Sequence, residues 1–271
     1  VGSEMCIRDR AIPAVVAHGG AGPGPERNEN VEIAVREAAR ILQSGGSALD
    51  AAIEACVILE NDPVFNAGTG GVFRTDGSVL LDASIQTCDG RLGFVIAMHD
   101  TPNPIRVAAA LLDEEINGLT GQGAREWADK RGFVNAKVEG RHPVEDIGDT
   151  VGVITRDKNG LFACATSTGG CSFRPPGRVG DVPLPGSGFW TQTGVAVAAT
   201  GNGEEITNNL LSYRVLDKFV QSSDSLKEAL SWGLKEFIDD SISVGMIALS
   251  DKGEGVGIAN TDMPWSTWIG T

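Results

Sequence analysis

The segment Gly148-Asp149-Thr150-Val151-Gly152-Val153-Ile154 joins a polar stretch to an apolar one, and it decides how the rest of the chain is interpreted. The polar stretch, residues 133–149, has no hydrophobic period and contains glycine and proline, which indicates a linker. The run that follows Thr150 predicts a buried strand. A threonine hydroxyl needs a nearby base to become a good nucleophile, and the α-amine of an N-terminal threonine is one such base. Thr150 can have that amine only if the chain is cut after Asp149.

Three further segments combine glycine with polar side chains: Ser167-Thr168-Gly169-Gly170, Gly177-Arg178-Val179-Gly180-Asp181 and Ala199-Thr200-Gly201-Asn202-Gly203. Thr168 and Thr200 each end a predicted strand before a glycine turn, so their polar groups can point into a site. Arg178 can hold a carboxylate by a two-pronged hydrogen bond, and Asp181 can accept an ammonium group. Together they would bind the zwitterionic end of an aspartyl group. Taken singly, these residues also fit turn threonines and a surface ion pair of little energetic value.

In their order along the chain, these segments resemble the plant-type L-asparaginase/isoaspartyl peptidase family of N-terminal-nucleophile hydrolases, from about Ala14 to Asp262. The resemblance implies that Thr150 attacks the Asp149 carbonyl, that water cleaves the resulting ester, and that the new α-amine acts as general base. Thr168 would support the nucleophile, while Thr200 and Gly201 would form the oxyanion hole. The substrate would be bound by Arg178, Asp181, Gly201, Gly203 and Asn66. The resemblance implies no cofactor for catalysis, and a homodimer of cleaved units.

The loop from Leu59 to Gly68 matches a family loop that binds a monovalent cation chiefly through backbone carbonyls and places Asn66 near the nucleophile. The resemblance therefore implies a structural sodium ion at Leu59, Glu60, Asp62, Phe65, Ala67 and Thr69. The segment from His18 to Gly22 resembles the family's N-terminal segment and lacks the spacing of a phosphate-binding loop, so we interpret it as backbone packed beside the site. Asp82 belongs either to the site or to a structural turn.

Three other features resemble the glycosylasparaginase branch. The residue before the nucleophile is Asp149, whereas plant-type members usually have glycine there. The other two features are the segment Pro185-Gly186-Ser187-Gly188 and the sequence of residues 199–203. Three functions therefore stay open. The first is an amidohydrolase acting on the β-amide of asparagine or the β-peptide bond of isoaspartyl dipeptides. The second is a glycosylasparaginase. The third is a binding module that never matures. The chain contains neither an Asn-x-Ser/Thr sequon nor a signal-peptide pattern, which disfavours a compartment that contains glycoprotein substrates. We therefore favour the first function.

Hydrophobic periodicity predicts strands over residues 14–18, 79–86, 92–98, 150–155, 162–166, 195–199, 244–249 and 256–259, and helices over 31–44, 48–59, 104–116, 121–131, 204–220 and 226–237. Ser47 and Ser225, each three residues before an acidic residue, predict helix caps. Pairs of strands thus alternate with pairs of helices, and two mainly antiparallel sheets between two helix layers would bury both sheet faces. This α+β, four-layer αββα sandwich is also what the resemblance implies. We expect a single domain over 11–271, with an α chain to residue 149 and a β chain from 150.

Composition limits the partners and the compartment. A chain of 271 residues with 41% hydrophobic and 21% charged residues is typical of globular proteins. The net charge of -14 disfavours nucleic acids and anionic membrane surfaces, and no apolar run approaches the roughly 20 residues of a membrane span. The small-molecule substrate and the two self-derived chains are the expected partners. Five cysteines without a C-x-x-C pair, and no signal-peptide pattern, predict the cytoplasm. Residues 1–10 show no apolar period, and we expect them to be non-native.

Overall fold

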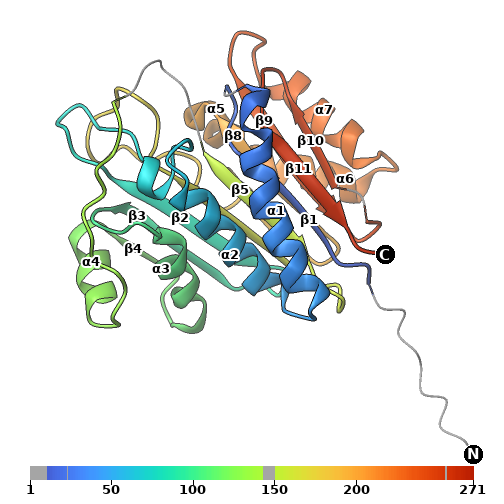
Figure 1. The fold of residues 1–271 in the computed structure, drawn as a ribbon. Helices are drawn as coiled ribbons and strands as arrows, with labels where there is room; N and C mark the ends of the chain where they lie inside the picture. Colours follow the sequence, from blue (N-terminus) through green and yellow to red (C-terminus); the bar gives the residue numbers. More distant parts are fainter. Residues whose placement is uncertain (1–10, 23, 143–149, 254) are drawn as a thin grey trace, which may run out of the picture.

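The computed structural model describes residues 11–22, 24–142, 150–253 and 255–271, and it is a mixed α/β protein with two sheets (Figure 1). The non-native segment expected at residues 1–10, Asp149 and the end of the expected linker lie outside the described residues. No helix in the described ranges combines the length and apolar character needed to cross a membrane.

The larger sheet has the strand order β11-β1-β5-β6-β2-β3-β4, and every neighbouring pair is antiparallel except β3 and β4. Its strands are β1 (Ala14–His18), β2 (Leu81–Thr87), β3 (Leu92–Met98), β4 (Gly118–Thr120), β5 (Val151–Arg156), β6 (Phe162–Thr168) and β11 (Trp265–Ile269). The smaller sheet is antiparallel, in the order β10-β9-β8-β7. Its strands are β7 (Phe189–Gln192), β8 (Val195–Gly201), β9 (Val244–Ser250) and β10 (Gly255–Ala259).

The two sheets face each other, which explains why their inner strands are apolar on both faces. In β1, Val15 and Ala17 pack into the core beneath helices, whereas Val16 packs into a core shared with β8 and β9. In β8, Val197 faces helices and Ala198 faces the larger sheet. Because successive side chains of a strand point to opposite faces, burial of both faces requires continuous apolar runs rather than alternation.

Helices cover the outer face of each sheet. The helices are α1 (Asn28–Gln43), α2 (Ala48–Asn61), α3 (Pro104–Ala110), α4 (Gly121–Asp129), α5 (Gly203–Asn208), α6 (Leu211–Gln221) and α7 (Leu226–Phe237), with short 3-10 helices at 25–27, 68–70 and 111–113. Figure 1 shows α1 and α2 side by side across the larger sheet, and their apolar residues join its core. Apolar residues of α6 and α7 pack on the smaller sheet. Ser47 caps α2, and Ser225 forms a full capping box with Glu228, as the sequence predicts.

Some expected boundaries are wrong. The helix expected over 204–220 is two helices, because Leu210 adopts a left-handed φ of 47° between α5 and α6. The helix expected over 104–116 ends at Ala110 and continues as a 3-10 turn. Strands β4, β7 and β11 were not expected. They are short, and β11 owes its conformation to pairing with β1 from the opposite end of the chain, which local sequence does not encode.

The sheet register brings several glycine-rich segments to one end of the molecule. His18, at the end of β1, pairs with Gly152 near the start of β5, and Val151 pairs with Ser167 near the end of β6. The end of β8 lies at the same place, because the backbone N–H of Ala21, just after β1, donates to Thr200 Oγ1 at 3.3 Å. The ends of three strands and the beginning of β5 therefore surround Thr150.

Candidate active site

Two of the expected site threonines are in contact. Thr150 is only 4% exposed, and its Oγ1 donates to Thr168 Oγ1 at 3.2 Å. The antiparallel register of β5 and β6 places the two side chains opposite each other. Thr168 Oγ1 also accepts a hydrogen bond from the N–H of Gly170 at 3.0 Å, where a φ of +81° favours glycine. The turn after β6 therefore fixes the hydroxyl group that orients Thr150.

His18 forms one wall beside Thr150. Its Nδ1 accepts from the Gly20 N–H at 3.2 Å, and its Nε2 lies where a side chain on Gly152 would stand. Burial lowers the pKa of His18 to about 3, although the Thr150 backbone acts in the opposite direction. The imidazole is therefore neutral near pH 7, and the segment from His18 to Gly22 packs closely against the site as expected.

Thr200 and Gly201 lie at the end of β8. Thr200 is fully buried, and Oγ1 accepts from the Ala21 N–H. Gly201 has a φ of +126° and lies against the Ser243 carbonyl, so a larger residue would be strained and would clash there. Asn202 follows as the N-cap of α5, with its Oδ1 accepting from the Glu205 N–H at 3.1 Å. The turn is thus held by contacts on both sides.

Arg178, Asp181 and Gly203 meet at the start of α5. A side chain on Gly203 would lie 2.8 Å from both Arg178 Nη2 and Asp181 Oδ1, so only glycine leaves this space open. The Arg178 guanidinium donates a two-pronged hydrogen bond to Glu204, with distances of 3.0 and 2.6 Å. Asp181 is buried, and its Oδ2 has no hydrogen-bond partner within the described residues.

Two buried carboxyl groups have unusual acidities. Burial raises the pKa of Asp181 to about 7 and that of Asp82 to about 6, and in both cases Arg178 acts in the opposite direction. Burial would lower the pKa of Arg178, but hydrogen bonds to Glu204 and the surrounding anionic groups raise it overall. Asp82 lies in strand β2 rather than in a turn, and its Oδ1 accepts from the Ala97 N–H at 2.7 Å. Its Oδ2, like that of Asp181, has no partner among the described residues.

The loop after α2 supports the turn that carries Thr168. Asn66 Oδ1 accepts from the Val72 N–H at 3.0 Å, and Asn66 Nδ2 donates to the Gly170 carbonyl at 2.5 Å. The backbone carbonyl of Asn66 accepts from the Gly169 N–H at 2.8 Å. The Glu60 carboxylate accepts from Ser167 Oγ at 2.7 Å, and burial raises the pKa of Glu60 to about 8. The structure therefore places this loop directly behind Thr168.

Backbone carbonyls converge in the same loop. The Glu60 carbonyl oxygen lies 2.6 Å from the position of a side chain on Gly68, and the Pro102 carbonyl borders the same position. Helix α2 ends at Asn61, where the last carbonyls of a helix have no partner within it and carry a partial negative charge. The described residues contain no group of three His, Cys, Asp or Glu side chains able to hold a metal ion. The Glu60 and Pro102 carbonyls are backbone oxygens that a cation could use as donors here.

Two charged residues at the site were not singled out from the sequence. Glu204 directly follows Gly203, so its place beside Arg178 could have been inferred from the motif. Arg74 could not, because it lies in a loop between the 3-10 helix at 68–70 and β2 with no hydrophobic period. Its side chain is buried against Gly170, and Nη2 donates to the Leu80 carbonyl at 3.2 Å.

Comparisons with known proteins agree on one family. The family model described as Asparaginase matches residues 11–142 and 134–269. The chain is 36% identical to the plant-type L-asparaginase of Pyrobaculum calidifontis, over 89% of this chain and 92% of that protein. It is 40% identical to the isoaspartyl peptidase/L-asparaginase of Danio rerio, over 76% of this chain and 75% of that protein. The isoaspartyl peptidase/L-asparaginase of Homo sapiens is 36% identical, over 94% of this chain and 92% of that protein.

Proposed function

Because the chain belongs to the asparaginase family, we propose that it is an amidohydrolase that cleaves the β-amide of L-asparagine and the β-peptide bond of isoaspartyl dipeptides. Thr150 is the proposed nucleophile. The observation that carries this assignment is the buried pair of hydroxyl groups, with Thr150 Oγ1 at 3.2 Å from Thr168 Oγ1 at the beginning of β5. A hydroxyl held by a second hydroxyl, next to a segment that must be cut to release its amine, matches the needs of an N-terminal nucleophile.

Maturation is the first proposed reaction. Thr150 Oγ1 attacks the carbonyl carbon of Asp149, the peptide bond shifts to an ester, and water hydrolyses the ester. The products are an α chain that ends at Asp149 and a β chain that begins at Thr150. The α-amine released on Thr150 has an ordinary pKa near 7.7 to 8.0, so a useful fraction is unprotonated at neutral pH.

Substrate hydrolysis uses the same atoms. The α-amine accepts the hydroxyl proton as Thr150 Oγ1 attacks the β-carbonyl of the aspartyl group. The proton then goes to the leaving nitrogen as the carbon–nitrogen bond breaks, which releases ammonia or an amino acid. Water hydrolyses the aspartyl ester and regenerates the threonine. Thr200 Oγ1 and the N–H of Gly201 are the proposed donors to the oxyanion that forms at each attack.

Arg178 and Asp181 are the proposed binding groups for the aspartyl end of the substrate. A guanidinium binds an α-carboxylate in a two-pronged geometry, and a buried carboxylate with one unpartnered oxygen can accept an α-ammonium. Gly203 keeps the space between them free of side-chain atoms. Gly201 completes the proposed contacts, and Asn66 acts through the Gly170 turn that it holds.

A monovalent cation fits the loop after α2. The proposed donors are backbone carbonyl oxygens of Leu59, Glu60, Asp62, Phe65, Ala67 and Thr69. Such oxygens suit a hard cation, and the C-terminal end of a helix favours positive charge. A bound ion would supply charge balance and rigidity behind Thr168. Catalysis itself would use the groups of this chain.

The remaining assignments concern assembly and compartment. We propose one domain over 11–271 with the four-layer αββα arrangement, supported by the cores beneath α1 and α2, between the sheets, and beneath α6 and α7. The homodimer of cleaved units is proposed from the family resemblance. The cytoplasm is proposed because the four described cysteines are free thiols, as is usual in a reducing compartment.

A substrate panel tests the function. Purified wild-type protein is assayed on asparagine, β-aspartyl-leucine and a glycosylated asparagine, with Thr150→Ala as the matched inactive variant. We expect turnover of the first two substrates that disappears in the variant. A tenfold preference for the glycosylated asparagine over β-aspartyl-leucine would instead assign the chain to glycosylasparaginase chemistry. An uncut protein without turnover would support the non-maturing binding module.

A further inference from the structure

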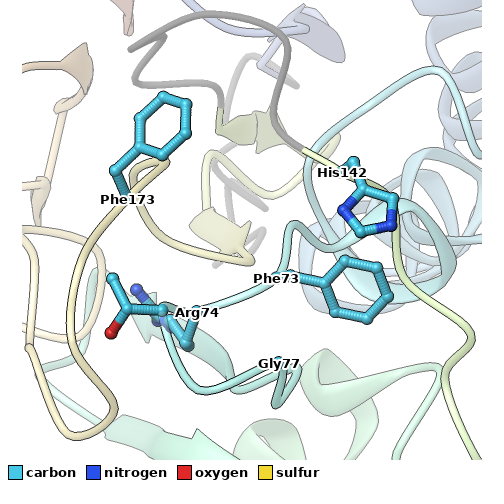
Figure 2. Close-up of a pocket in the computed structure, with 6 residues that line it drawn as sticks. Phe73, Arg74, Gly77, His142 and Phe173 are labelled. Carbon is cyan, nitrogen blue, oxygen red and sulfur yellow. The ribbon is translucent and has the colours of Figure 1, made fainter.

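A pocket of about 370 Å³ adjoins the turn that carries Thr168, and no part of the proposed reaction uses it. Its lining residues are Phe73, Arg74, Thr75, Gly77, His142 and Phe173. In Figure 2 the rings of Phe73 and His142 lie together on one side, with Arg74 and Phe173 on the other. The volume lies in the range of pockets that bind small molecules.

Arg74 is the unusual member of this lining. Arg74 is only 3% exposed, yet its Nε and Nη1 atoms have no hydrogen-bond partner within the described residues. Burying a cation with unpaired donors is costly, so such groups are normally satisfied by a partner. Arg74 is the only arginine or lysine in the described ranges with a buried, unpartnered nitrogen.

The guanidinium also lies next to the reaction centre. It packs against Gly170, whose N–H donates to the same Thr168 hydroxyl that receives the Thr150 hydrogen bond. It is near enough to Arg178 and Asp82 for both to affect its pKa, which burial lowers. If Arg178 holds the aspartyl end of a substrate, Arg74 would therefore bind a group at the other end of the same substrate molecule.

The pocket walls are aromatic and partly open. The Phe73 and His142 rings pack with centroids 4.8 Å apart, and Phe173 is 54% exposed. Phe173 also has a φ of 58°, a conformation that is strained for a bulky residue and that is found preferentially at functional sites. The pocket thus combines one buried cation with apolar surface, which is the chemistry of an amino acid that has a carboxylate and a large side chain.

We propose that this pocket binds the leaving amino acid of an isoaspartyl dipeptide, with Arg74 holding its C-terminal carboxylate and Phe73 and Phe173 contacting its side chain. This subsite rests on the proposed function and deepens it. An isoaspartyl dipeptide has two carboxylates and one ammonium, which match two arginines and Asp181. Asparagine releases ammonia and leaves the pocket empty. The leaving group of a glycosylated asparagine is a sugar without a carboxylate, so Arg74 favours dipeptides over that substrate.

The test compares three substrates on the mature enzyme: asparagine, β-aspartyl-leucine and β-aspartyl-leucinamide, in which the carboxylate is neutralised. Arg74→Gln should lower kcat/KM for β-aspartyl-leucine by about thirtyfold or more, as expected for loss of a desolvated charge pair. The same variant should stay within threefold of wild type on asparagine and on the leucinamide. Arg74→Lys should recover part of the loss, because it restores the charge without the planar fork. Arg91→Gln, at an exposed arginine paired with Asp89, is the matched control.

Equal losses on all three substrates, or no loss on the dipeptide, would overturn the subsite. If Arg74→Gln does not fold or mature, wild-type enzyme decides the question alone: β-aspartyl-leucine must exceed the leucinamide in kcat/KM by at least tenfold, and equality refutes the proposal. Phe173→Ala should lower kcat/KM for β-aspartyl-phenylalanine more than for β-aspartyl-glycine. If the enzyme hydrolyses asparagine but hydrolyses β-aspartyl-leucine and the leucinamide equally well, the proposed function stands and the subsite is refuted. If no substrate is hydrolysed, both the proposed function and the subsite are refuted.

Discussion

Replacing Arg178 by alanine, in parallel with Glu204 by glutamine, separates substrate binding from a structural ion pair. The two residues form a two-pronged pair, but their side chains differ in exposure: 10% for Arg178 and 48% for Glu204. If Arg178 only stabilises the fold through Glu204, either substitution breaks the same interaction and both variants should lose a similar amount. If Arg178 binds the substrate carboxylate, the losses should differ widely.

The expected losses follow from these exposures. The Arg178 side chain is mostly shielded from solvent, and truncating such a hydrogen-bonded charge where it meets a ligand costs about 2 to 5 kcal/mol, or roughly thirtyfold to several thousandfold in kcat/KM. Glutamine at position 204 keeps an acceptor oxygen and changes only a half-exposed ion pair, which is worth under about 1 kcal/mol, or roughly fivefold. We therefore expect Arg178→Ala to be at least about sixfold more damaging than Glu204→Gln.

The assay is kcat/KM for asparagine on mature protein, with intact mass and thermal midpoints to confirm cutting and folding. Both variants should retain midpoints close to that of wild type, because Arg178 lies on a loop outside the three apolar cores. An Arg178→Ala enzyme within threefold of wild type would refute the assignment of the carboxylate-binding group. Losses of equal size in the two variants would show that the ion pair, not substrate contact, explains the effect.

Three further outcomes are expected. Intact mass of wild-type protein should reveal pieces of 149 and 122 residues (271 minus 149), whereas Thr150→Ala should stay whole; a cut elsewhere contradicts the mechanism. The value of kcat/KM should fall steeply as the pH drops below about 7, because two protonations then oppose the reaction: that of the Thr150 α-amine, and that of Asp181, whose pKa burial raises to about 7 and whose protonated carboxyl cannot hold an ammonium group. Asp181→Asn should remove the second protonation and leave only the shallower dependence on the α-amine; a slope that stays as steep as in wild type would exclude Asp181. Replacing sodium by choline should lower the thermal midpoint if the loop after α2 binds the ion; identical midpoints in both buffers argue against that site.

The inner strands were predictable because burial of both faces leaves continuous apolar runs. Strands β1, β5 and β8 lie within two residues of their expected boundaries. The division between α5 and α6 depends instead on distant chain segments. The N–H of Tyr213, in the first turn of α6, donates to the Gly186 carbonyl at 2.9 Å, so a loop far away in the sequence fixes where this helix begins. Hydrophobic periodicity within the helix does not predict such a contact.

The candidate site divides in the same way. Thr168, Thr200 and Arg178 are predicted as site residues because each stands close to glycines that permit tight turns, and such turns leave a characteristic local pattern. Arg74 stands in a segment whose polar composition indicates an exposed loop. Its burial comes from the Gly170 turn, almost a hundred positions later in the chain, and from the Leu80 carbonyl. The leaving-group side of the site was therefore the part that sequence reasoning could not place.

The preference between leaving groups then becomes a question of charge balance. Arg178 lies close enough to Arg74 to lower the pKa of Arg74, while Asp82, whose own pKa is raised by burial, acts in the opposite direction. A buried cation such as Arg74 is costly unless an anion meets it with good hydrogen-bond geometry. Arg178 is already paired with Glu204, whereas two nitrogens of Arg74 have no partner within the described residues. The single carboxylate of asparagine would therefore leave Arg74 without an anion, whereas an isoaspartyl dipeptide would bring a second carboxylate to it. The electrostatic gain on binding is therefore larger for the dipeptide than for asparagine, and it should weaken at high ionic strength less than a surface interaction would, because both arginines are shielded from solvent.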